Sequence, residues 1–90
     1  MNKARRKTIA AILSDIETLT SLMDEIKSAI ETVKDEERDY YDNMPESFQS
    51  GDKGEAADAA ATALEEAFSA FEEIESQLQE AVSNLETASE

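Results

Sequence analysis

An apolar residue recurs at every third or fourth position through most of this chain, and this spacing limits the possible folds more than any other feature. The intervals alternate between three and four residues from Ile9 to Val33, and again from Ala57 to Ala88. Such spacing places the residues along one side of an α-helix, at heptad positions a and d, with Ile9 and Ala57 both at position a. The sequence therefore predicts an all-α fold with two long helices. The predicted contact residues are Ile9, Ile12, Ile16, Leu19, Met23, Ile26, Ile30 and Val33 in the first half, and Ala57, Ala60, Leu64, Ala67, Phe71, Ile74, Leu78, Ala81, Leu85 and Ala88 in the second.

The segment between the two patterns contains signals for a chain reversal. Pro45 cannot continue a helical hydrogen-bond ladder and disfavours helix at the residue before it. A single helical turn is expected at residues 45–47. Ser50 or Asp52 can cap the second helix, and Asp52 followed by Glu55 has the spacing of a capping box, which predicts the start of that helix.

These signals predict helices over about residues 3–43 and 52–88, joined by a loop over about residues 44–51. Ninety residues allow one domain. Because the helices are matched in length and the loop is short, residues 1–90 are expected to form one antiparallel two-helix coiled-coil hairpin. In that hairpin the numbers of facing residues add up to about 95.

Further apolar residues flank the heptad pattern and make each apolar stripe wider than one neighbouring helix can cover. The hairpin is therefore expected to associate with itself into a four-helix bundle, as a homo-oligomer. The flanking residues are Leu13, Leu22, Ala29, Ala61, Phe68 and Val82.

The charge of the chain is strongly negative and unevenly distributed. Its 22 acidic and 8 basic residues give a formal net charge of −14, and no basic residue follows Lys53. Such a surface repels nucleic acid and anionic membranes and attracts basic proteins. With no membrane-spanning stretch in the sequence, the expected location is the cytoplasm of a host cell.

The chain contains no cysteine and no histidine. Disulfides, thiol nucleophiles, imidazole bases and thiolate or imidazole metal sites are therefore excluded. No glycine-rich phosphate loop or EF-hand loop is present. The sequence predicts no catalytic residue, no cofactor and no metal site, which favours a non-enzymatic binding protein.

The second predicted helix carries many carboxylates without intervening positive charge. Four of them, Glu65, Glu66, Glu72 and Glu73, are the candidate partner-binding residues of this acidic face. A regular array of carboxylates can imitate the phosphates of duplex DNA and occupy the groove of a basic nucleic-acid-binding protein. The simpler interpretation is a solvated face that keeps the protein soluble.

Two other clusters each allow two interpretations. Tyr41, Met44 and Phe48, with Tyr40 beside them, either cap the open end of the core or form an aromatic anchor for a partner. The basic start, Lys3-Ala4-Arg5-Arg6-Lys7, either contacts an acidic partner or pairs within the hairpin with Glu86, Glu90 and the terminal carboxylate.

The turn, Asp42-Asn43-Met44-Pro45-Glu46-Ser47-Phe48-Gln49, resembles that of small acidic helical-hairpin proteins encoded by phages and prophages. Their turn reads Asp-Asn-hydrophobic-Pro-Glu-polar-hydrophobic-Gln, and Phe48 stands where leucine is more usual. The resemblance implies an accessory protein of a phage or mobile element, and implies no activity.

The predicted function is a protein-binding module that acts on a host protein. A sharper form is a DNA mimic that inhibits a nuclease, a restriction enzyme or a CRISPR effector. The alternative is a structural or assembly component, such as a scaffold, that acts through self-association.

Overall fold

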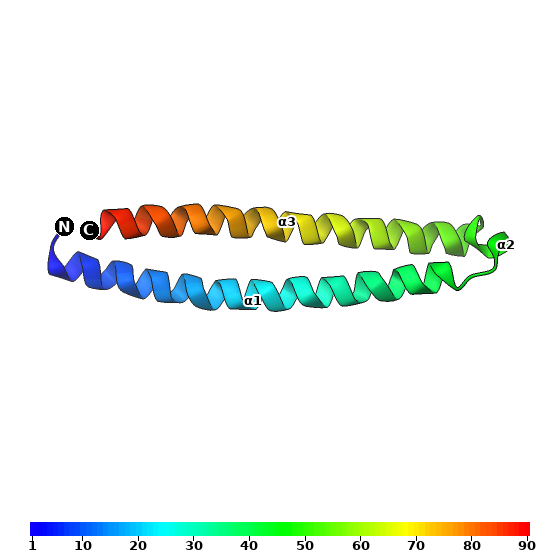
Figure 1. The fold of residues 1–90 in the computed structure, drawn as a ribbon, viewed down its shortest axis with the longest axis horizontal. Coiled ribbons are helices and arrows are strands. Elements are labelled where there is room, and N and C mark those ends of the chain that lie inside the picture. Colours follow the sequence, from blue (N-terminus) through cyan, green and yellow to red (C-terminus); the bar gives the residue numbers. More distant parts are fainter. The chain divides into compact units, whose positions relative to one another are not determined.

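The computed structural model describes all 90 residues. It contains three helices, namely α1 (Lys3–Asp42, 40 residues), α2 (Glu46–Gln49, 4 residues) and α3 (Asp52–Ala88, 37 residues) (Figure 1). The prediction of an all-α fold is confirmed. The two long helices end within one residue of their predicted bounds, and the expected single turn of helix in the loop is α2.

Local hydrogen bonds explain where the long helices begin. The side-chain oxygen Oδ1 of Asn2 accepts a bond of 2.8 Å from the N–H of Arg5, which makes Asn2 the N-cap of α1. The N–H of Glu55 donates to the carbonyl of Gly51 at 2.9 Å, so Gly51 is the cap residue of α3. The prediction of Ser50 or Asp52 as the cap was wrong, because Ser50 is the C-cap of α2 and Asp52 already belongs to α3.

The chain divides into two compact units, and each contains a segment of α1 and a segment of α3. The first unit combines Met1–Glu25 with Phe71–Glu90, and the second comprises Ile26–Ala70. In the first unit Arg6 Nη2 donates to the main-chain oxygen of Glu90 at 3.0 Å. The chain ends thus lie side by side, as in an antiparallel pair (Figure 1).

Two contacts set the register of the antiparallel segments in the second unit. Arg38 Nη1 donates to Asp58 Oδ1 at 2.7 Å, and Lys27 Nζ lies 5.3 Å from the centroid of the Phe68 ring. Both pairs match the register that the short turn predicts.

Burial shows that the helices pack through positions a and e, whereas the sequence predicted a and d. The buried apolar residues are Ile9, Met23 and Ala57 at position a, and Ala61 at position e. Gly54, also at position e, is buried as well. Most d residues of α1 are exposed, namely Ile12, Leu19, Val33 and Tyr40.

Residue size gives the physical reason for this difference. Ala61 is small and lies at position e of α3, so α1 can approach closely on that side, and Gly54, one heptad earlier, lets Gln49 of α2 approach. Bulky side chains at position d of α1 would hold the helices farther apart. The second unit therefore packs on its smallest residues.

Ala61 is fully inaccessible, with 0% exposure, which leads to a test of this close packing. We expect Ala61→Leu to lower the free energy of unfolding by about 2 kcal/mol, because added methylenes must force the helices apart. The matched variant Ala59→Leu adds the same atoms at an exposed position two residues away, so we expect a change below about 0.5 kcal/mol. Urea unfolding followed by circular dichroism measures both. Equal losses would contradict the a and e packing.

Candidate protein-binding surfaces

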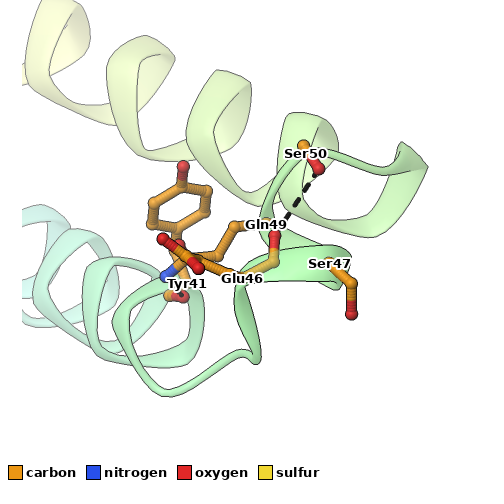
Figure 2. A pocket seen from close by; sticks show the side chains of 5 residues that line it. All are labelled: Tyr41, Glu46, Ser47, Gln49 and Ser50. Atoms are coloured by element: carbon orange, nitrogen blue, oxygen red, sulfur yellow. Dashed lines mark hydrogen bonds between the residues drawn. The ribbon is translucent and has the colours of Figure 1, made fainter.

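The tip of the hairpin, from Tyr40 to Lys53, carries two separate pockets. One has a volume of about 570 Å³ and is lined by Tyr41, Glu46, Ser47, Gln49 and Ser50 (Figure 2). In it the Gln49 side chain extends back from α2 and its Nε2 donates to the Tyr41 carbonyl at 3.0 Å. The Ser50 hydroxyl donates to the Glu46 carbonyl at 3.5 Å. The Gln49–Tyr41 bond ties α2 to the end of α1, whereas the Ser50–Glu46 bond lies within α2 and its C-cap.

The second pocket of the tip is smaller, about 190 Å³, and more apolar. It is lined by Tyr40, Met44, Phe48 and Lys53. Of the three predicted tip residues, the structure thus brings Met44 and Phe48 together and places Tyr41 on the other pocket. Tyr40 and Phe48 are 53% and 58% exposed, so these two rings do not cap the core. Tyr41 and Met44 are half-buried.

The acidic residues of α3 differ in how they are used within the chain. Glu65 Oε1 lies 3.1 Å from Arg38 Nη2, so Glu65 forms an ion pair inside the second unit. Its charge is therefore partly compensated, and of the four predicted residues it is the least available to a partner. Glu66, Glu72 and Glu73 are exposed on α3.

Arg38 is a residue that the sequence analysis missed. Its guanidinium hydrogen-bonds to Asp58 and to Glu65, and these bonds raise the pKa of Arg38 above its usual value. Asp58 and Glu65 are seven residues apart, two turns along one side of α3. That spacing and the predicted register were the available signals for a cation on α1 that bridges two turns of α3.

Two other cations of the second unit also face other parts of the same unit. Lys27 lies over the Phe68 ring, and Lys34 Nζ lies 3.7 Å from Asp35 Oδ1. In the first unit Arg6 bonds to Glu90, which favours the internal interpretation of the basic start for this residue. Lys27 and Arg6 thus contact other parts of their own units, whereas Lys3, Arg5, Lys7 and Lys53 are exposed.

The fold contains neither a candidate membrane span nor a candidate metal cluster. No helix of the protein is long and apolar enough to cross a bilayer. No group of three or more acidic, histidine or cysteine side chains is placed to hold a metal ion.

Comparison with models of protein families, with curated proteins and with solved structures finds no match to this chain.

Proposed function

We propose that this protein is a non-enzymatic protein-binding module, encoded by a phage or other mobile element, that binds a basic nucleic-acid-binding protein of its host. The observation that carries the proposal is the segregation of charge on α3. Glu66, Glu72 and Glu73 face solvent, whereas Arg38 of α1 pairs with the neighbouring carboxylates Asp58 and Glu65.

The sharper form of the proposal is mimicry of DNA. Exposed carboxylates along a helix present successive negative charges, as the phosphates of a duplex do. A protein that binds nucleic acid offers a positively charged groove of the complementary sign. The target class that follows is a nuclease, restriction enzyme or CRISPR effector, which the acidic helix would inhibit by occupying the groove.

Inhibition of DNA cleavage by a panel of purified restriction and CRISPR nucleases tests this function. We expect the sensitive enzyme to recover when duplex DNA is added in excess. The inhibition constant should also rise steeply as salt increases from about 0.05 M to about 0.5 M, because the contacts are ionic. A panel that is not inhibited at any salt concentration would contradict DNA mimicry.

Reversing the charge of the exposed acidic residues of α3 tests whether they form the surface that binds the nuclease. We expect the triple variant Glu66→Lys, Glu72→Lys and Glu73→Lys to bind the sensitive nuclease at least about 100-fold more weakly, because each reversed charge meets a basic groove.

The matched control for this variant reverses three exposed carboxylates of α1, with Glu17→Lys, Glu25→Lys and Glu31→Lys. It changes the net charge by the same amount on the other helix, so we expect a loss below about fivefold. Equal losses in the two variants would show that total charge matters and the α3 surface does not.

A second candidate function is a structural or assembly role, and the exposed d residues of α1 favour it. Self-association of the hairpin into a four-helix bundle would cover them, and either function is compatible with such a bundle. Co-purification with assembled phage particles would favour the structural role, while inhibition of a nuclease by the free protein would favour the first.

A further inference from the structure

The d residues leave an apolar surface uncovered in each unit. In the first unit Leu19 of α1 is 44% exposed and Ile74 of α3 is 45% exposed, and Ile12 and Leu22 are exposed beside them. In the second unit Val33 and Tyr40 are exposed on α1. These side chains are too large and too regularly spaced to be ordinary surface residues.

Helix geometry places the d residues of both helices on the same side of each unit. With about 100° of rotation per residue, position e lies about 40° to one side of position a, and position d about 60° to the other. Both helices turn a and e toward each other. Because the helices are antiparallel, their opposite directions bring the two d rows to one common side, which we call the d face.

The charge pattern of α3 shows what kind of surface can approach the d face. Every d and g residue of α3 from 56 to 88 is uncharged, whereas the exposed acidic residues lie at b, c and f. These uncharged residues are Ala56, Ala60, Ala63, Ala67 and Ala70 in the second unit, and Ile74, Gln77, Ala81, Asn84 and Ala88 in the first. On α1 the only charged g residues beside the d row are Asp15 and Glu36. A basic partner could pair there only with these two carboxylates, so the fitting occupant is another mostly apolar, uncharged surface.

The accessible area of the chain is large enough for such a contact. The protein exposes 6508 Å². An average monomeric protein of its 9.9 kDa mass exposes about 5200 Å². The difference, about 1300 Å², exceeds the roughly 800 Å² that each partner contributes to a standard stable interface.

The d face also complements itself in size. In the first unit α1 contributes the bulky Ile12 and Leu19, and α3 contributes the small Ala81 and Ala88 next to Ile74. If α1 of one copy lies on α3 of the other in the same register, the bulky Ile12 meets the small Ala81, as the knobs and holes of a coiled coil require. Leu19 then meets Ile74. Stacking α1 on α1 would instead set bulky residues against each other.

We propose that a second copy of this chain docks on the d face, with α1 of each copy on α3 of the other, and that the acidic side of α3 stays outside. The inference deepens the self-association proposed above and rests on it. It adds the face, the pairing of helices and the reason why two copies of charge −14 can meet, since their exposed α3 carboxylates point away from the contact.

Sedimentation equilibrium of the full chain over a range of concentrations tests the face. We expect twice the chain mass of 9.9 kDa for the wild type. The double variant Leu19→Arg and Ile74→Arg is expected to be monomeric, because both charges enter an apolar contact. Its helix content, measured by circular dichroism, separates dissociation from unfolding. A monomeric wild type, or a d-face variant that remains dimeric, would overturn the proposal.

The matched control places the same two charges on the outer side of the same unit, with Thr18→Arg and Ser76→Arg at exposed positions. It is expected to stay dimeric, and dissociation of this control would overturn the assignment of the contact to the d face.

Disulfide trapping tests the pairing of helices, since the chain has no cysteine of its own. One sample carries Ile12→Cys and the other Ala81→Cys, so a mixed disulfide can form only between copies. We expect the mixed disulfide to accumulate in preference to either symmetric one on mild oxidation. Dominance of a symmetric disulfide would overturn the arrangement of α1 on α3.

Failure of this inference and failure of the proposed function give different results. One outcome is a monomeric wild type that still inhibits a nuclease, with only the Glu66, Glu72 and Glu73 variant losing that inhibition. This result would overturn docking of a second copy on the d face and leave the proposed function intact. If the wild type is dimeric, the Leu19 and Ile74 variant is monomeric and no nuclease is inhibited, docking on the d face is supported and DNA mimicry is overturned.

Discussion

Replacing Gly54 by alanine is expected to lower the melting temperature by about 10 °C, although alanine is the better helix former. A Cβ built on Gly54 falls 2.6 Å from the Gln49 Cα and also meets the Gln49 carbonyl carbon and oxygen. These are backbone atoms that cannot rotate away, so overpacking should cost about 3 kcal/mol. The higher helix propensity of alanine should offset about 1 kcal/mol of this cost. The net loss of about 2 kcal/mol corresponds to that shift in a domain of this size.

Gly51→Ala is the matched control for this variant. The added Cβ would lie 3.5 Å from the Phe48 carbonyl oxygen and 3.8 Å from that of Ser47, which are ordinary contact distances. No glycine of the chain has a positive φ, so the backbone tolerates alanine. We expect Gly51→Ala to leave the melting temperature unchanged or to raise it slightly. Thermal unfolding that shows the same fall for both variants would contradict the close approach of α3 to Gln49.

The second large effect is expected at Met23, which is 4% exposed in the first unit. Its truncation in Met23→Ala removes apolar contacts and leaves a cavity, so the free energy of unfolding should fall by about 2–5 kcal/mol. Small domains are stable by about 5–15 kcal/mol, so this one loss could remove much of the total. Few other buried apolar side chains support the first unit, where Ile9, 8% exposed, is the only other buried one.

Urea unfolding measures the Met23 effect, with all variants at the same protein concentration because self-association would raise apparent stability. Met23→Leu conserves volume and is expected to cost less than about 1.5 kcal/mol. Ser21→Ala, at an exposed position on the same helix, should change stability by less than about 0.5 kcal/mol. A loss at Met23→Ala no larger than at Ser21→Ala would show that position a does not form the core.

The sequence was sufficient to predict the helices and their register. Periodic apolar residues identify a helix without reference to its partner, and Pro45 marks where the first one must stop. A short turn then leaves little freedom in the pairing, so contacts such as Arg6 with Glu90 fall where the predicted register puts them.

The face of contact could not be predicted in the same way. Intervals of three and four residues place a and d on one apolar stripe, but they do not show which edge of the stripe meets the other helix. That choice depends on how closely the two long helices approach, and the small Ala61 beside the stripe, which is fully inaccessible, favours the e edge of α3.

The sequence predicted the residue types of the candidate binding surfaces better than the contacts that their side chains make. The acidic character of α3 follows from counting charges. The pairing of Glu65 with Arg38 does not, because it depends on side-chain positions across two helices. At the tip, adjacency in sequence suggested one cluster, but consecutive residues of a helix point in different directions, so Tyr40 and Tyr41 line different pockets.

The division of α3 into an inner a and e side and an outer b, c and f side has a consequence for how this protein can evolve. Residues that hold the fold and most residues that present charge are different residues of one helix, apart from Glu75 at position e. Substitutions on the outer side can therefore accumulate without repacking the core. A lineage that must follow a changing target could alter its binding surface step by step while its hairpin stays the same.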